Sequence, residues 1–142
     1  MYNHGFSNHI GEVELFVAKN LVSSSLYDVK DFTEISSDHV IKVKVDTLDN
    51  FFSSYKEILL IKLDVQGAEL SIIQEGRETL KKTKLVLTEM SIIEMYHGAC
   101  IYHDVDKFLR DNNFRIHTII SNYNKDGLKY FDILYIKNDH NI

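Results

Sequence analysis

The chain has 142 residues, weighs 16.5 kDa and carries a formal charge of −5, with 44% hydrophobic and 26% charged residues. The length suits one domain with its own core, so we expect a single domain over residues 1–142, and the composition excludes a disordered chain. One cysteine, Cys100, excludes a disulfide-stapled secreted mini-domain. The net negative charge gives no electrostatic reason to bind nucleic acid or an anionic membrane.

The sequence also predicts a location. No run approaches the ~18 consecutive apolar residues of a membrane span. Residues 1–5 lack the basic and apolar regions that begin a signal peptide. We therefore expect a cytoplasmic protein without a membrane partner.

The first half of the chain favours strands. Residues 12–17 and 40–45 alternate apolar and polar side chains, as half-buried strands do. Asp49 could cap a short helix over residues 50–55. Residues 58–65 are almost continuously apolar, which is typical of a strand buried on both faces of a parallel sheet.

The second half alternates helices and strands. The spacing of apolar residues predicts a helix over 68–80, a strand over 85–90, a helix over 103–112, and two closing strands over 114–121 and 130–137. The alternating part calls for parallel strands joined by helical crossovers. The last two strands, joined by a turn over residues 122–127, predict an antiparallel hairpin at one edge.

Two acidic residues stand where predicted parallel strands end. Asp64 ends the strand that begins at residue 58, and Glu89 ends the strand that begins at residue 85. Ligands bind at the carboxyl ends of strands in open parallel sheets. We therefore expect both carboxylates on the same edge of the sheet, the edge formed by these strand ends, which we call the rim. There they could act as a base, bind a cation or position a hydroxyl. The simpler alternatives are that Asp64 caps the next helix and that Glu89 pairs with a lysine.

Other residues near this rim are less specific. Lys62 lies two residues before Asp64, on the same face, and we expect it to have a carboxylate partner. Gln66 and Gly67 form the turn after the strand, where glycine permits a tight turn or a close backbone approach. The six glycines form no GxG pair and no GxxxxGK[ST] loop, so the known nucleotide-binding turns are absent from the sequence.

Two histidines flank a loop near the rim. The spacing of His97 and His103 is not the i, i+4 pattern of helical metal ligands, so we expect surface histidines. A substrate or proton-transfer role for His97 is the functional alternative. Cys100 has no paired histidine and is expected to be a small core residue. A metal hydrolase using Asp64, Glu89 and His97 is the weakest hypothesis, and no metal is assigned.

Several motifs occur in an order that resembles one family. Residues 61–69, Ile-Lys-Leu-Asp-Val-Gln-Gly-Ala-Glu, resemble the signature of FkbM-type methyltransferases. Residues 45–49, 87–91, 96–98, 113–114 and 132–135 resemble the segments that accompany this signature. The ordered set covers nearly the whole chain, although each motif alone would be weak.

The resemblance implies a fold and an activity. It implies the Rossmann-like α/β fold of class I methyltransferases, here a partial doubly wound, mostly parallel sheet with a C-terminal antiparallel hairpin. It also implies S-adenosylmethionine as cofactor and O-methylation of a hydroxyl on a sugar, glycan, polyketide or other small metabolite. On the matching positions, Asp64, Gln66 and Gly67 would contact the cofactor, and Asp64, Glu89 and His97 would be catalytic.

The resemblance also implies that part of the domain is missing. The family's first strands, with their Gly-rich turn, have no counterpart here, and we expect an N-terminally truncated or split domain. A homo-oligomer or a partner chain could then supply the missing half. The alternative is a non-catalytic binding or assembly module that has lost the cofactor site.

Overall fold

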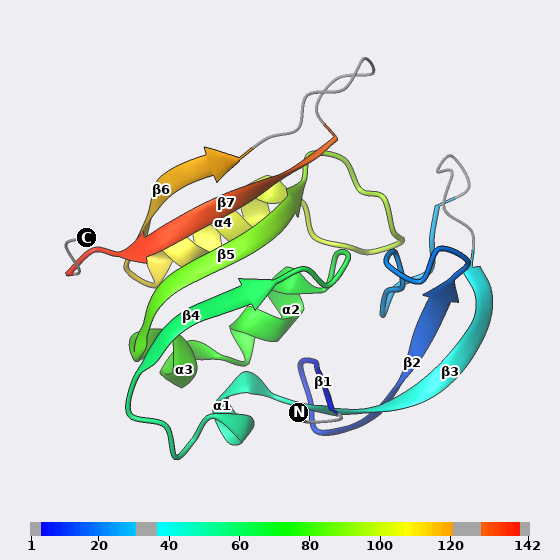
Figure 1. Ribbon diagram of the computed structural model, residues 1–142, viewed down its shortest axis with the longest axis horizontal. Coiled ribbons are helices and arrows are strands. Elements are labelled where there is room, and N and C mark those ends of the chain that lie inside the picture. Colours follow the sequence, from blue (N-terminus) through cyan, green and yellow to red (C-terminus); the bar gives the residue numbers. More distant parts are fainter. Residues whose placement is uncertain (1–3, 31–36, 121–128, 140–142) are drawn as a thin grey trace.

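The computed structural model describes residues 4–30, 37–120 and 129–139, which form an α/β chain with two mixed sheets (Figure 1). In chain order the elements are β1 (Gly5–Phe6), β2 (Gly11–Ala18), β3 (Ser37–Asp46), α1 (Leu48–Phe51), β4 (Ile58–Leu63), α2 (Glu69–Gln74), α3 (Arg77–Lys81), β5 (Thr83–Ser91), α4 (Tyr102–Asp111), β6 (Phe114–Ile120) and β7 (Tyr130–Lys137). The positions of the predicted strands and of the final helix are therefore confirmed. The prediction that the strand over 58–65 is buried on both faces is wrong, because Leu59 and Leu60 of β4 are exposed. The predicted turn over 122–127 lies outside the described residues.

The larger sheet has the strand order β4–β5–β7–β6. β4 and β5 are parallel, as predicted, whereas β7 is antiparallel to both β5 and β6. The predicted C-terminal antiparallel hairpin at one edge of the sheet is confirmed, and it joins the sheet through β7, which pairs with β5. The sheet is therefore mixed, and the prediction of a mostly parallel sheet is wrong for the described strands.

The smaller sheet has the order β1–β3–β2 and lies apart from the larger one (Figure 1). β2 and β3 form a long antiparallel ribbon, and the short β1 pairs in parallel with β3. Glu12 lies opposite Lys44 and Glu14 opposite Lys42, so the alternating charges predicted as a polar strand face do occupy one face of the ribbon. The other face carries the apolar residues between them.

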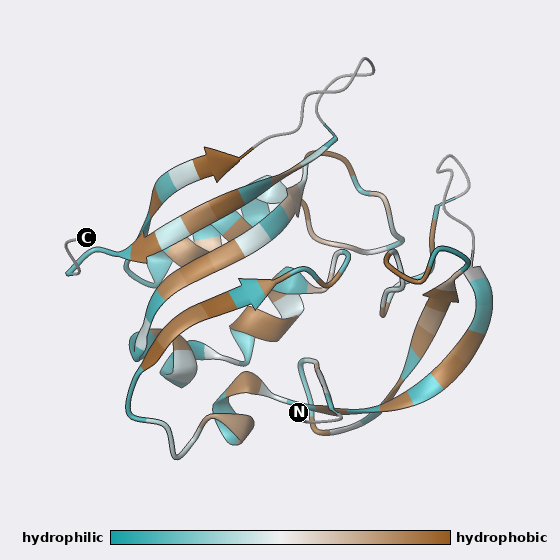
Figure 2. Cartoon of the chain, viewed as in Figure 1, coloured by the Kyte–Doolittle hydropathy of each residue, from teal (hydrophilic) through white to brown (hydrophobic). Residues whose placement is uncertain are grey.

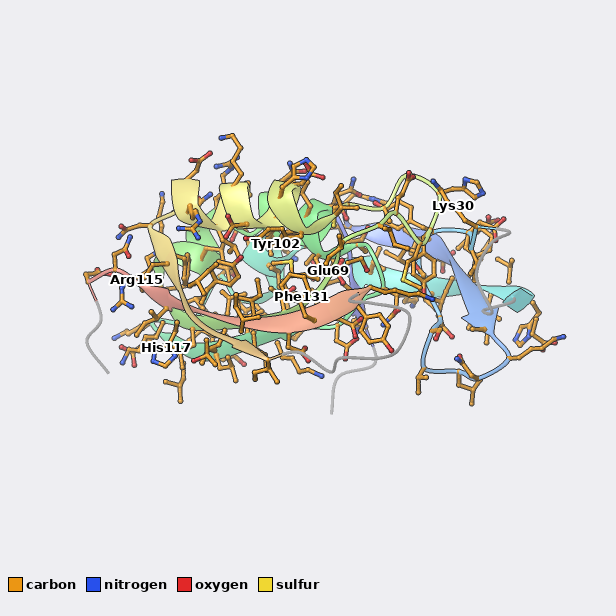
Figure 3. The ribbon with its side chains drawn as sticks, turned by 90° about the horizontal axis from the view of Figure 1, so that it is seen from above. Lys30, Glu69, Tyr102, Arg115, His117 and Phe131 are labelled. Carbon is orange, nitrogen blue, oxygen red and sulfur yellow. The ribbon has the colours of Figure 1, made fainter. Side chains whose placement is uncertain are left out.

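The core lies between the larger sheet and its helices. α2 and α4 lie on one face of the sheet in two views at right angles (Figures 1 and 3). Alternate residues of each strand join this core, including Val86 and Met90 of β5 and Phe131 and Ile133 of β7. Figure 2 shows the matching concentration of hydrophobic residues along β4, β5 and β7. Asp64 and Glu89 belong to the opposite alternation and are therefore kept out of the core.

The predicted helix over residues 68–80 is instead two short helices, α2 and α3, separated at Gly76. A Cβ atom on Gly76 would lie 2.7 Å from Leu48 Cδ1, so glycine is needed for the close packing of α1. Helix α1 begins after Thr47, whose side chain caps it. The predicted cap Asp49 lies inside α1, and its carboxylate accepts the first N–H groups of α3 instead.

No helix within the described ranges is long and apolar enough to span a membrane.

Candidate functional site

The site begins with an ion pair at the end of β4. Asp64 is the first residue after the strand, and its Oδ2 lies 3.0 Å from Lys62 Nζ. Both side chains are largely exposed, so the predicted carboxylate partner of Lys62 is confirmed, although at the surface. The hydrogen bond and charge of Asp64 raise the pKa of Lys62, which keeps the lysine positively charged.

The turn after Asp64 has two consecutive residues with left-handed backbone angles. Gln66 has φ of 52° and Gly67 has φ of 98°. At Gly67 a side chain is excluded in any case, because a Cβ atom would lie 2.5 Å from the Cβ of Ala99. The Ser25 hydroxyl donates to the carbonyl oxygen of Gln66 at 2.7 Å, and the Cys100 N–H donates to that of Gly67 at 3.3 Å. The turn is therefore held by two segments distant in the sequence, the loop after β2 and the loop after β5.

The left-handed turn places the Gln66 side chain at the rim, where it forms hydrogen bonds with the two predicted carboxylates. Its Nε2 donates to Asp64 Oδ1 and to Glu89 Oε2, each at 3.1 Å. Its Oε1 accepts from the hydroxyl of the buried Tyr96 at 2.9 Å, and that hydroxyl also lies 3.2 Å from the carbonyl oxygen of Ser23. One amide thus orients both carboxylates, so their predicted placement on a common rim is confirmed. The simpler alternatives fail: the carboxylate of Asp64 does not cap α2, and that of Glu89 bonds to Gln66 instead of a lysine.

Glu89 is the half-buried member of the pair. Burial raises the pKa of its carboxyl, and the negative charges of Asp64 and Asp132 raise it further, against the lowering effect of the Gln66 hydrogen bond. Asp132 lies directly opposite Glu89 in the β5–β7 pairing. The sequence reasoning missed Asp132 as a site residue, and the signal that would have found it is the pairing of β7 with β5.

A third carboxylate, Glu69, is the first residue of α2 and is buried (labelled in Figure 3). Its Oε1 accepts the backbone N–H of Val65 at 3.2 Å, and Cys100 Sγ lies 3.6 Å from its Oε2. Burial raises the pKa of Glu69. Burial also raises the pKa of Cys100 to about 12, so the thiol stays protonated, in line with its predicted role as a packing residue.

The two histidines lie elsewhere. His97 is exposed in the loop after β5, where its backbone N–H donates to the carbonyl of Asp28 at 2.9 Å. His103 lies on α4 with its Nε2 3.0 Å from Asp104 Oδ1. Within the described ranges no hydrogen bond joins the His97 ring to either rim carboxylate, so its role stays a prediction. Nor do these ranges bring three or more His, Cys, Asp or Glu side chains together as metal ligands.

A cavity of about 860 Å³ opens beside Asp64, between the smaller sheet and the end of β4. This volume falls within the roughly 300–1,000 Å³ of small-molecule sites. Its walls are of mixed polarity and include Phe6, Ser25, Lys44, Val45, Asp64 and Val65. Asp64 therefore stands at the junction of the carboxylate rim and a space large enough for a small ligand.

Comparison with known proteins identifies the family. The family described as "Methyltransferase FkbM domain" matches residues 1–116 of the chain. The chain is 33% identical over 94 residues to the 2-O-methyltransferase NoeI of Sinorhizobium fredii, a match that covers 65% of this chain and 39% of that protein. No solved structure matches the chain significantly. Because the family match covers most of the chain and includes the rim residues Asp64 and Glu89, the chain belongs to the FkbM methyltransferase family.

Proposed function

We propose that the rim at the ends of β4 and β5 is the methyl-transfer site of an S-adenosylmethionine-dependent O-methyltransferase. The acceptor is a hydroxyl on a sugar or another small metabolite, such as a glycan or polyketide. The observation that carries the proposal is the bridge from Asp64 through Gln66 to Glu89, beside a cavity of ligand size. The name of the 2-O-methyltransferase relative supports oxygen as the methylated atom.

The residues at the rim suit a cationic methyl donor. S-adenosylmethionine supplies a methyl group made electrophilic by a positively charged sulfonium. Asp64 offers an exposed carboxylate on the cavity wall, and Glu89 and Asp132 add negative charge close by. Apolar cavity residues such as Phe6 and Val65 suit the flat adenine ring. We propose that Asp64, Gln66 and Gly67 form the donor side of the site.

The chemistry of Glu89 suits it to accept the proton of the acceptor hydroxyl. Methyl transfer to oxygen needs the hydroxyl proton to leave, and a carboxylate with a raised pKa accepts a proton better at neutral pH than an ordinary one. Gln66 fixes one oxygen of Glu89, and no donor among the described residues binds the other. Most of the remaining catalysis comes from positioning the two reactants in line. The part of His97 in substrate binding or proton transfer remains a prediction.

The test is transfer of a labelled methyl group from S-adenosylmethionine to a panel of sugars and hydroxylated polyketides by the protein that contains these residues. We expect activity in the wild type and in Asp111→Asn, a control on the exposed face of α4. Asp64→Asn and Glu89→Gln should each lose at least about tenfold, in line with the loss of a charged or proton-accepting group. Folded protein without transfer to any acceptor would contradict the proposal and favour the non-catalytic binding module.

A further inference from the structure

The β5–β7 pairing places two carboxylates directly opposite each other at the proposed site. Glu89 and Asp132 are direct partners in the antiparallel register. Opposed residues in such a pair project from the same face, with Cβ atoms about 4.5–5.5 Å apart. Both belong to the alternation that also carries Lys62, on the face away from the core. Like charges at this spacing repel each other and destabilise the sheet, so stability does not account for this pair of carboxylates.

The two carboxylates differ in how they are compensated. Glu89 receives one hydrogen bond, from Gln66 to Oε2, and within the described ranges no donor reaches its Oε1. The carboxylate of Asp132 makes no hydrogen bond or ion pair with the described residues, and nearby Lys62 forms its ion pair with Asp64. The charge of Asp132 therefore acts on both Lys62 and Glu89, and among the described residues no ion pair of its own offsets its effect on Glu89.

Asp132 is also the group that can be altered without dismantling the rim. Among the described residues, the charged or titratable groups that act on Glu89 are Lys62 and Asp64 at the end of β4, Glu69 on α2, Tyr96 in the loop after β5, and Asp132 on β7. Asp64 is held by Lys62 and Gln66, while Glu69 and Tyr96 hold the turn and its side chains. Removing the charge of Asp132 breaks none of these bonds.

We propose that Asp132 is a positioning residue of the methyl-transfer site. Its charge acts on Glu89, and Glu89 Oε1 is the atom that receives the proton of the acceptor hydroxyl. In this step the hydroxyl oxygen forms its bond to the donor methyl, and the carbon–sulfur bond breaks with its electron pair remaining on sulfur. The hydroxyl proton passes to Glu89 Oε1. This role rests on the proposed function.

The experiment measures the titration of the Glu89 carboxyl directly, by carbon NMR, in four proteins. In Asp132→Asn the Glu89 midpoint should fall by roughly 0.5–2 pH units, the range expected for one unit charge at this spacing. In Asp132→Glu, which keeps the charge, and in Asp111→Asn, a remote carboxylate on α4, the midpoint should stay near that of the wild type. An unchanged midpoint in Asp132→Asn would overturn the proposal, provided that circular dichroism shows an intact fold.

The pH profile of methyl transfer separates this role from a structural one. The acidic limb of the rate profile should move to lower pH in Asp132→Asn by the same amount as the Glu89 midpoint. A shifted midpoint with an unshifted acidic limb would refute the positioning role while leaving the proposed function intact. Absence of transfer by the wild type would instead overturn the proposed function, and this role with it, even if the carboxylates are coupled.

Discussion

Replacing Gly67 with alanine tests whether the turn at the rim has the geometry described. Two separate effects oppose a side chain at this position. The backbone has φ of +98°, which is unfavourable for any residue with a Cβ atom. The added Cβ would also lie 2.5 Å from the Cβ of Ala99, where neither atom belongs to a flexible side-chain end. The substitution should therefore distort the turn that carries Gln66.

The magnitude follows from adding the two effects. The left-handed backbone costs about 1–2 kcal/mol for a residue other than glycine. Overpacking against Ala99 costs about 1–3 kcal/mol. Gly67→Ala should therefore reduce the free energy of unfolding by about 2–5 kcal/mol, a large share of the roughly 5–15 kcal/mol of a typical domain.

The chain contains a matched control for the backbone effect. Gly98 has φ of +77°, and a Cβ atom there would meet nothing within 4 Å. Urea unfolding followed by circular dichroism should therefore give a loss of about 1–2 kcal/mol for Gly98→Ala. Adding Ala99→Gly to Gly67→Ala should recover part of the excess. If Gly67→Ala is no more destabilising than Gly98→Ala, the close contact with Ala99 is wrong.

Two further substitutions test carboxylates that hold the helices near the site. Asp49→Ala removes the carboxylate that accepts the backbone N–H groups of Glu78 and Thr79 in α3, at 3.1 and 2.6 Å. The free energy of unfolding in urea should fall by about 0.5–2 kcal/mol. An unchanged unfolding midpoint would mean that the cap does not form in solution. For Glu69, burial raises the pKa in the folded state, so its stabilising effect is complete in acid and is lost as pH rises through that folded value. The side chain introduced by Glu69→Gln cannot ionise, so the stability of this variant relative to the wild type should increase as the pH rises above the unfolded value of about 4.3. A stability difference that is independent of pH would contradict the burial of an ionisable Glu69.

Some of the site could be predicted because it depends on local pattern and simple topology. Asp64 and Glu89 were expected on one rim because the carboxyl ends of neighbouring parallel strands coincide, and β4 and β5 are indeed parallel neighbours. Asn113 follows α4 with a left-handed φ of 69°, a conformation that asparagine adopts at helix ends more readily than most residues. These features depend on a few consecutive residues, whose alternation or chemistry is visible in the sequence.

The features that were missed depend on contacts between distant segments. Helical spacing over 68–80 does not reveal that Leu48 occupies the space beside Gly76 and divides the helix. Nor does the sequence reveal that Gln66 adopts a left-handed turn, which returns its amide to both carboxylates. Asp132 enters the site only because β7 inserts beside β5. Local pattern predicts an element, but the side chains that complete a site are placed by packing between elements.

The measurement that tests the central claim most directly compares two ligands that differ in charge. S-adenosylmethionine carries a positive sulfonium, whereas S-adenosylhomocysteine has a neutral sulfur. If Asp64 on the cavity wall attracts the sulfonium, Asp64→Asn should weaken the binding of S-adenosylmethionine about fivefold, which corresponds to about 1 kcal/mol for an exposed charge pair. Calorimetric titration should show a much smaller loss for S-adenosylhomocysteine. An equal loss for both ligands, or no loss for either, would contradict the assignment of this rim as the methyl-donor site.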